Sequence, residues 1–265
     1  MNNITFDIKC WNINQKITQL HQFIITGTEK NNVNIACLQE FHINNFKLSN
    51  LKYEEHDPHQ CYVFYNGAIT GVFTYSVGIA QQGIGMPKFP KRQDYGTLVV
   101  WNSNVFDFCG IKTPSYFINQ SFKNDELGIR TTPWVILCTR NFKFFNIMSV
   151  HGHATNQNKK NALFKSIFND MQQCNIPTLI IGDFNYNPKD LIPLIPTHLN
   201  FKPFNGITHI DPTTKHQWCI DHVVYKLITI TNLLISGIDQ QNGCMKSLLA
   251  EKGHDHGILS FSVTF

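Results

Sequence analysis

The sequence has few arginines, no cysteine pairs with the spacing of a zinc site and no long apolar run. Its eight cysteines include no C-x-x-C pair and no cysteine–histidine pattern of zinc-site type, which argues against a structural zinc module. Several, such as Cys37 and Cys138, lie within apolar stretches, where reduced cysteine packs as a small apolar side chain. No apolar run approaches the roughly 18 residues of a transmembrane helix, and residues 1–10 lack the regions of a signal peptide. We therefore expect neither a membrane span nor an export signal.

Positive charge is in slight excess. The formal net charge is +4 and the isoelectric point is about 8.6, a balance that is compatible with an anionic partner such as nucleic acid without requiring one. Only three of the basic residues are arginines, namely Arg92, Arg130 and Arg140. Because a guanidinium group binds phosphate oxygens in a bidentate manner, each of them is a candidate phosphate ligand.

The chain has enough apolar material for one large domain. Of its 265 residues, 42% are hydrophobic and 12% are aromatic, and no linker, internal repeat or low-complexity tract divides it. We interpret residues 1–265 as a single domain.

Short apolar runs rich in β-forming residues recur along the chain and predict strands. Two stretches have helical spacing instead, one with Ile17, Leu20 and Ile24 and the other with Leu163, Ile167 and Met171. The segment 66–91 is rich in Gly, Gln and Pro and predicts meandering strands and surface loops. The fold class is therefore mixed α/β. The expected strands cover residues 4–11, 33–38, 97–101, 134–138, 144–150, 178–181, 220–225 and 258–263.

One of these strands leads into a motif with chemical potential. The apolar run 178–181 is followed by Gly182, and then Asp183 and Asn185 lie two residues apart. Residues two apart on an extended chain point the same way, so a carboxylate and an amide can bind a water and a phosphoryl oxygen side by side. Because Gly, Asp and Asn are also ordinary turn residues, this motif alone is equally compatible with a tight turn.

Other expected strands run into polar residues in the same way. The expected strand segments Phe6 to Trp11, Val33 to Gln39 and Phe144 to Val150 lead directly into Asn12, Glu40 and His151. Side chains at strand ends can converge on one cleft. Near the C-terminus Asp221 begins an expected strand, and Asp255 and His256 directly precede the last one. If those two strands run antiparallel to the others, their first residues reach the same edge. The remaining histidines in these motifs, His153, His222 and His254, are interpreted as bystanders.

This ordered set of motifs resembles the endonuclease/exonuclease/phosphatase, or deoxyribonuclease I-like, superfamily. Within it, the chain looks most like the catalytic subunits of cytolethal distending toxins. The motifs that carry the superfamily resemblance are Trp11-Asn12, Leu38-Gln39-Glu40, His151, Gly182 to Asn185, Ile220-Asp221 and Asp255-His256. Those that carry the toxin resemblance are Gly128-Ile-Arg130, Val150 to Thr155 and Pro212 to Gln217 followed by Ile220-Asp221.

The resemblance implies a four-layer sandwich, with two mixed β-sheets flanked by helices, and a Mg²⁺-dependent phosphodiesterase that works by in-line attack of water on phosphorus. Glu40, Asp255 and Asn12 would hold Mg²⁺, which Mn²⁺ or Ca²⁺ could replace in vitro. Arg130 and Asn12 would bind the substrate phosphate. The implied catalytic residues are His151, Asp183, Asn185, Asp221 and His256.

DNA is the expected partner, as the substrate of a nicking endonuclease. The alternative is a phosphatase or phospholipase that uses the same site on phosphoinositides or sphingomyelin, and a third interpretation is an inactive binding module. The toxin resemblance also suggests a secreted toxin or effector that acts inside a host cell after delivery by other subunits. The sequence departs from the superfamily pattern in three places. Phe41-His42 follows Glu40 where deoxyribonuclease I has an arginine, the last motif ends in Gly257 rather than proline, and no carboxylate is identified to orient His151.

Overall fold

The computed structural model describes residues 4–13, 33–42, 52–56, 61–66, 68–81, 88–118, 130–204, 206–246 and 254–265. The helix expected around Ile17, Leu20 and Ile24 lies outside the described residues, and so does Gly128 of the toxin-like motif.

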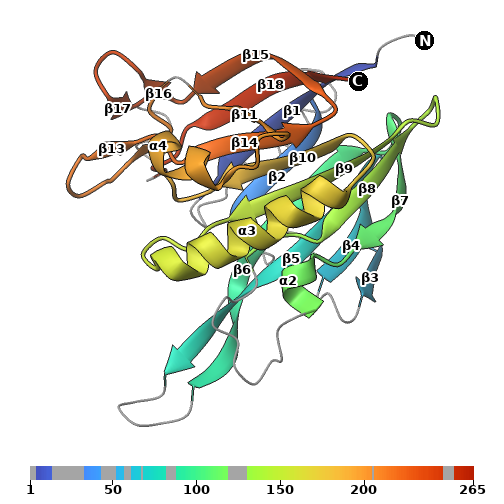
Figure 1. Ribbon diagram of the computed structural model, residues 1–265, viewed down its shortest axis with the longest axis horizontal. Coiled ribbons are helices and arrows are strands. Elements are labelled where there is room, and N and C mark those ends of the chain that lie inside the picture. The colour runs from blue at the N-terminus through green and yellow to red at the C-terminus, as the bar shows by residue number, and fades with distance from the viewer. Residues whose placement is uncertain are drawn as a thin grey trace.

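The larger sheet has eight strands in the order β15-β18-β1-β2-β6-β5-β4-β3 (Figure 1). Strands β1 and β2 are parallel, and the other neighbours are antiparallel. The bounds are β1 (Thr5–Asn12), β2 (Val33–His42), β3 (Lys52–His56), β4 (Cys61–Asn66), β5 (Ile69–Gln81), β6 (Lys88–Asn102), β15 (Thr229–Ser236) and β18 (Ile258–Thr264).

The smaller sheet has six strands in the order β11-β14-β10-β9-β8-β7. Its β9 and β10 are parallel, and the other neighbours are antiparallel. The bounds are β7 (Phe106–Lys112), β8 (Trp134–Thr139), β9 (Phe144–His151), β10 (Thr178–Asp183), β11 (Asn200–Lys202) and β14 (Asp221–Lys226). Two short hairpins complete the strands: β12 (His209–Ile210) pairs with β13 (Gln217–Trp218), and β16 (Ile238–Asp239) pairs with β17 (Cys244–Met245).

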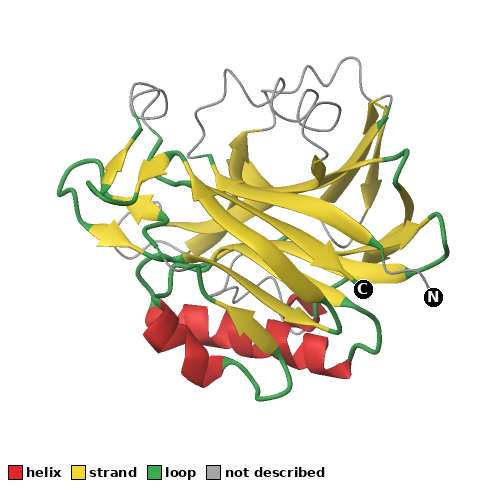
Figure 2. Cartoon of the chain, turned by 90° about the horizontal axis from the view of Figure 1, so that it is seen from above, coloured by secondary structure: helices red, strands yellow, loops and turns green. Residues whose placement is uncertain are grey.

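Helices cover the outer face of the six-stranded sheet (Figure 2). The longest, α3 (Gln157–Gln173), begins at Asn156, whose side chain accepts a hydrogen bond from the Lys159 backbone N–H. This cap satisfies a backbone donor that the first turn leaves without a helical partner. The apolar spacing of Leu163, Ile167 and Met171 defines its buried face. The other helical elements are α2 (Ser115–Ile118), α4 (Pro188–Leu191) and the 3₁₀ turn η3 (Ile192–Leu194).

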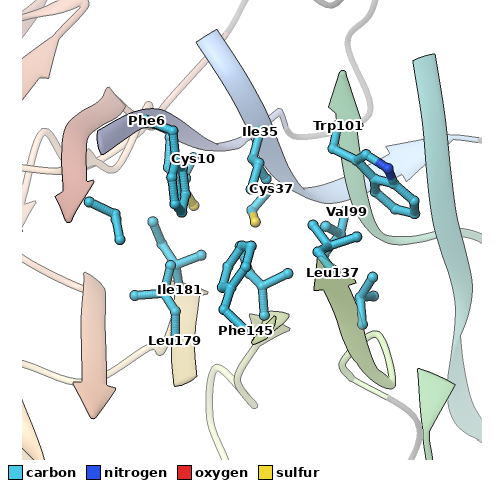
Figure 3. Close-up of a cluster of buried hydrophobic side chains, with 14 of the residues drawn as sticks. Phe6, Cys10, Ile35, Cys37, Val99, Trp101, Leu137, Phe145, Leu179 and Ile181 are labelled. Carbon is cyan, nitrogen blue, oxygen red and sulfur yellow. The ribbon is translucent and has the colours of Figure 1, made fainter. Parts of the chain in front are cut away.

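The main core lies between the two sheets (Figure 3). Alternate residues of one strand serve different layers: in β10, Leu179 and Ile181 face the other sheet, whereas Ile180 packs with the residues beneath α3. Burial on both faces explains why these strands are continuous apolar runs rather than alternating ones. The structure therefore confirms the two mixed sheets that the resemblance implied.

All eight expected strands are present, and most extend beyond their expected ends. In segment 66–91, where meandering strands and surface loops were expected, the described residues contain the end of β4, all of β5 and the start of β6, which follow one another as antiparallel neighbours. Residues 67 and 82–87 of this segment lie outside the described residues. All eight cysteines are free thiols. None of the helices in the described ranges has the length and hydropathy that crossing a membrane requires.

Candidate active site

Three candidate residues lie side by side on one rung of the six-stranded sheet. Asp183, the last residue of β10, pairs with His151 of the parallel strand β9 and with Asp221 of the antiparallel strand β14. The antiparallel direction of β14 brings the first residue of that strand beside the last residues of the other two. Convergence of the three motifs required this strand direction.

Gly182 makes this rung possible. Its φ of +151° lies outside the range that residues with a side chain readily adopt, and an added Cβ would come within 2.0 Å of the Val150 carbonyl oxygen. Glycine therefore lets β10 pass β9 closely just before Asp183.

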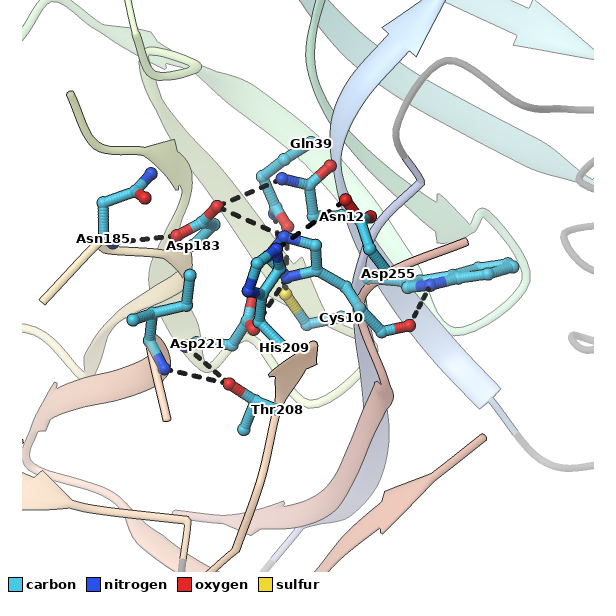
Figure 4. A network of polar contacts seen from close by, with 12 residues as sticks. Cys10, Asn12, Gln39, Asp183, Asn185, Thr208, His209, Asp221 and Asp255 are labelled. Atoms are coloured by element: carbon cyan, nitrogen blue, oxygen red, sulfur yellow. Dashed lines mark hydrogen bonds and ion pairs between the residues drawn. The ribbon is translucent and has the colours of Figure 1, made fainter. Parts of the chain in front are cut away.

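The eight-stranded sheet supplies Asn12 and Glu40. Asn12 ends β1 and its Nδ2 donates a hydrogen bond of 3.1 Å to Asp183 Oδ2 (Figure 4). The sequence predicted that Glu40 directly follows the end of its strand. This prediction was wrong, because β2 continues to His42. A bulge between Leu38 and Phe41, with Glu40 at φ 52°, interrupts the pairing instead. Glu40 Oε1 lies 3.5 Å from His151 Nε2.

His256 is held in place by Asp221. Its Nδ1 lies 2.9 Å from Asp221 Oδ2, while its Nε2 lies 3.7 Å from Asp183 Oδ2. Asp221 is itself fixed by Thr208, whose Oγ1 accepts hydrogen bonds from the backbone N–H groups of Ile220 and Asp221. Such a carboxylate fixes the ring orientation and favours the tautomer with the proton on Nδ1.

The two histidines have opposite electrostatic environments. Burial alone would lower the pKa of His256, but the carboxylates of Asp221, Asp183 and Asp255 outweigh it and raise the pKa to about 10. Burial lowers the pKa of His151 well below its usual value, and the positive charges of Arg130 and His256 lower it further. At neutral pH the site therefore holds one imidazolium and one neutral imidazole.

The Nε2 atom of His151 faces two carboxylates, Glu40 at 3.5 Å and Asp183 at 3.9 Å. Its buried Nδ1 has no hydrogen-bond partner within the described part of the chain. Among the described residues, the contacts of Nε2 therefore hold the ring.

Asp183 has a pKa near neutrality. Burial raises it, the positive charge of His256 lowers it, and the net result is a pKa of about 7. Its Oδ1 accepts a hydrogen bond of 2.8 Å from the Asn185 backbone N–H. The Asn185 side chain donates to the Gly152 carbonyl oxygen at 3.0 Å, so Asp183 and Asn185 are both fixed in place. A carboxylate with a pKa near 7 is well suited to accept a proton from water.

Arg130 and the three other histidines take different positions. Arg130 is half-buried, its backbone carbonyl accepts a hydrogen bond from the His151 N–H, and its positive charge lowers the pKa of His151. His222 is buried away from the cleft, with Nε2 2.6 Å from the Tyr186 carbonyl oxygen. His254 packs against the Trp11 ring, and His153 is buried.

A cleft of about 590 Å³ opens over this rung, and several of its lining residues were not anticipated from the sequence. His209 and Trp218 reach it because β12 and β13 form a hairpin; the turn residues Asp211-Pro212 were the available signal. Lys160 reaches it from α3, where it lies on the same face as Leu163 and could have been recognised by that spacing. The lining residues are Asn12, Glu40, His151, Ala154, Thr155, Gln157, Lys160, Asp183, Asn185, Tyr186, Asn187, Asp190, His209, Asp211, Trp218, Ile220, Asp255 and His256.

Lys160 stabilises the loop that follows Asp183. Its Nζ donates a hydrogen bond of 2.6 Å to the Asn185 carbonyl oxygen and lies 4.5 Å from the centre of the Tyr186 ring. Burial lowers the pKa of Lys160. Both contacts hold the ammonium group against the loop, so we interpret Lys160 as a support for Asn185.

The family model described as "Endonuclease/Exonuclease/phosphatase family" matches residues 10–234, a range that includes most of these side chains. The chain belongs to this family. Its members are hydrolases of phosphodiester bonds that usually use a divalent metal ion. No curated protein sequence matches the chain significantly.

Solved structures of family members share the fold at low identity. TDP2 of D. rerio, in complex with a single-stranded DNA product, is 11% identical with a TM-score of 0.61, over 98% of each chain. CdtB, the biologically active subunit of cytolethal distending toxin, is 15% identical with a TM-score of 0.58, over 97% of this chain and 96% of that one. The human Nocturnin catalytic domain with bound sulfate is 14% identical with a TM-score of 0.59, over 99% and 96%. At these identities the likeness establishes the fold.

The donor set suits the divalent metal ion that is usual in the family. Burial raises the pKa of Glu40, the carboxylate of Asp255 raises it further, and a hydrogen bond from the Asn12 side chain lowers it. All three residues line the cleft. Two carboxylates and an amide are hard oxygen donors, and a pair of nearby carboxylates is favourable where a cation neutralises them. These residues fit Mg²⁺.

Proposed function

We propose that this protein is a Mg²⁺-dependent phosphodiesterase that nicks DNA. The observation that carries the proposal is the arrangement at Asp183: a buried carboxylate with a pKa of about 7 lies within 4 Å of a neutral His151 ring and a protonated His256 ring. Titratable groups whose environments separate their pKa values in this way are typical of acid and base partners in catalysis.

Each side chain has a role that follows from its environment. Asp183 accepts a proton from the attacking water, and Asn12 keeps the Asp183 carboxylate oriented through its hydrogen bond. His256, held by Asp221, donates from Nε2 to a phosphoryl oxygen on which charge accumulates. The neutral His151 ring would contact the phosphate on one side, and His256 would contact it on the other.

Other residues bind and neutralise the phosphate. The Arg130 guanidinium, whose charge already acts on His151, would pair with a phosphate oxygen. Glu40, Asp255 and Asn12 would hold Mg²⁺, which when bound neutralises negative charge on the phosphate and stabilises the leaving oxygen. Asn185 is fixed beside Asp183, and the second hydrogen of its amide would donate to the phosphoryl group.

DNA is the proposed substrate for two reasons. The chain carries a net charge of +4, which favours association with a polyanion. It also shares its fold with CdtB and with a TDP2 structure that contains a DNA product. A phosphoinositide would present the same phosphate ester to the same residues, so it is the competing substrate in the test.

The test compares two substrates with one preparation of protein. Supercoiled plasmid is incubated with protein and Mg²⁺, and phosphate release from a phosphoinositide is measured in parallel. EDTA and Asp183→Ala are the negative controls, and Asp239→Ala, which changes a turn aspartate that does not line the cleft, is the matched control. We expect nicking that EDTA and Asp183→Ala abolish and Asp239→Ala retains. Phosphate release from the lipid without nicking would refute the DNA assignment and retain the phosphoesterase. Neither activity would refute the proposal as a whole.

A further inference from the structure

The hairpin β12–β13 adds a histidine beside the proposed Mg²⁺ ligands. His209 Nε2 lies 3.7 Å from Asp255 Oδ2, and the ring centres of His209 and His256 lie 4.4 Å apart. One ligand atom from each of His209, Asp255 and His256 lies within 4.8 Å of those of the other two. None of the roles proposed above uses His209.

The backbone holds these three residues in a fixed relation. His209 and His256 form an isolated β-bridge. On either side of it, the Ile210 N–H donates to the Asp255 carbonyl oxygen at 2.9 Å and the Gly257 N–H donates to the Thr208 carbonyl oxygen at 2.8 Å. Donors that the backbone holds in place bind a metal without first being ordered.

Each ring has one nitrogen that faces the cluster. His256 Nδ1 is bonded to Asp221, so Nε2 is the nitrogen that a metal would contact, and the metal would displace the Nε2 proton on binding. The buried Nδ1 of His209 has no hydrogen-bond partner among the residues that the structure describes, and Nε2 is the nitrogen that faces Asp255. All three side chains belong to residues that line the cleft, so an ion can reach them.

We propose that His209, Asp255 and His256 form a second cation site that selects a transition metal such as Zn²⁺ over Mg²⁺ and inhibits the enzyme. Two imidazoles and one carboxylate, with a fourth position open to water, suit Zn²⁺ in tetrahedral coordination. Imidazole is a poor ligand for Mg²⁺, which prefers oxygen. A bound Zn²⁺ would withdraw Asp255 and His256 from the phosphate. The binding site stands on its own geometry, whereas its inhibitory effect rests on the proposed function.

The first measurement is metal binding, which needs no activity. Full-length protein is titrated with Co²⁺, whose visible absorption reports tetrahedral coordination, and with Zn²⁺ by calorimetry. His209→Asn removes one ligand. His216→Asn is the matched control, because His216 packs against Trp218 on the same hairpin but belongs neither to the metal cluster nor to the cleft lining. Loss of an outer contact to a metal ligand commonly weakens binding about 10- to 100-fold, so loss of a direct ligand should weaken it at least tenfold.

The second measurement is plasmid nicking at fixed Mg²⁺ with increasing Zn²⁺. We expect inhibition of the wild type and of His216→Asn, and weaker inhibition of His209→Asn, which should retain its Mg²⁺-dependent nicking when Zn²⁺ is absent. Near-ultraviolet circular dichroism verifies folding, and His209→Gln replaces the asparagine variant if that protein is unfolded.

The outcomes separate the two proposals. If the wild type and the folded His209 variant bind Co²⁺ with the same affinity, and likewise bind Zn²⁺ with the same affinity, the metal site is overturned, whatever the nicking result. A tenfold difference in affinity without any nicking supports the metal site and refutes the nuclease. Nicking with equal sensitivity to Zn²⁺ in the wild type and His209→Asn overturns the inhibitory role.

Discussion

Replacing Asp221 by asparagine removes one negative charge from a buried ion pair and leaves the shape of the side chain nearly unchanged. Only 2% of the Asp221 side chain and 5% of the His256 side chain are exposed, so solvent screens their interaction weakly. Asp221 is the carboxylate that contributes most to the high pKa of His256. The substitution should therefore lower that pKa. It should also weaken the preference for the tautomer with the proton on Nδ1, because an amide can present either its oxygen or its NH₂ group to that nitrogen.

The size of the effect depends on pH. If the pKa of His256 fell from about 10 to the ordinary 6.5, the protonated fraction at pH 8 would fall from nearly all to roughly 3%. Loss of the proton alone would then slow the reaction about 30-fold at pH 8 and about fourfold at pH 7. These factors take the ordinary pKa as the reference, because in the variant burial still lowers the pKa of His256 while Asp183 and Asp255 still raise it. Misorientation of the ring adds a loss on the order of 10² that does not depend on pH.

The assay is the initial rate of plasmid nicking from pH 6 to pH 9 with saturating Mg²⁺. The ratio of wild-type rate to Asp221→Asn rate should increase by up to about 25-fold between pH 6 and pH 8. Asp239→Asn changes an aspartate that accepts hydrogen bonds within a turn and does not line the cleft, so it should leave the ratio at one. A ratio that stays constant across this range would show that His256 does not act as a cation, and the proton assignment would then be wrong.

Three further predictions concern His151, Asp183 and the neighbouring Gly182. His151→Ala should reduce nicking by on the order of 10² to 10⁴ with the fold intact, whereas the exposed His198→Ala should retain it; equal rates would exclude His151 from catalysis. Burial raises the pKa of Asp183 to about 7 from an ordinary 3.8, so the folded protein loses stability as the pH rises between these values. Asp183→Asn should therefore abolish nicking yet raise the Tm at pH 8 by about 2 °C or more, and a lower Tm in thermal melts would contradict the raised pKa. Gly182→Ala should destabilise the protein by about 3 kcal/mol or more in urea unfolding. Gly110→Ala, which has a similar φ of +136° but no atom near the added Cβ, should cost less, and equal losses would mean that the close contact with Val150 is unimportant.

Much of the site could be predicted because its residues lie at the ends of strands. The strand before Asp183 is buried on both faces and reads as a continuous apolar run, so Asp183 stands out after it. Asn12 and His151 end strands that also contain polar residues, so these two were recognised from the order of the motifs. The sequence also placed Asp221 at the start of one strand and His256 just before the last strand. Only the antiparallel direction of these strands was then needed to bring both residues to the same edge.

Residues whose position depends on a short hairpin or a bulge were harder to predict. His209 and Trp218 lie in strands of two residues each, too short to produce a periodic pattern. Glu40 was identified from its motif, but the bulge that turns it depends on pairing with β6 and leaves no mark in the local sequence. Lys160 interrupts the apolar face of α3. Its hydrogen-bond acceptor is the backbone carbonyl of Asn185, whose position is set only once the loop after β10 has folded.

The two sheets contribute to the site from opposite sides, and this division has a consequence for how the protein loses activity. Asn12 belongs to one sheet and Asp183 to the other, and their hydrogen bond crosses the interface between them. A second crossing bond, from Gln39 Nε2 to Ser149 Oγ at 2.8 Å, lies nearby and is fully buried. A small slide of one sheet over the other would break both bonds while each sheet kept its own ladder of backbone hydrogen bonds. Activity thus reports the alignment of the sheets, and on heating it should disappear before the far-ultraviolet signal of the strands.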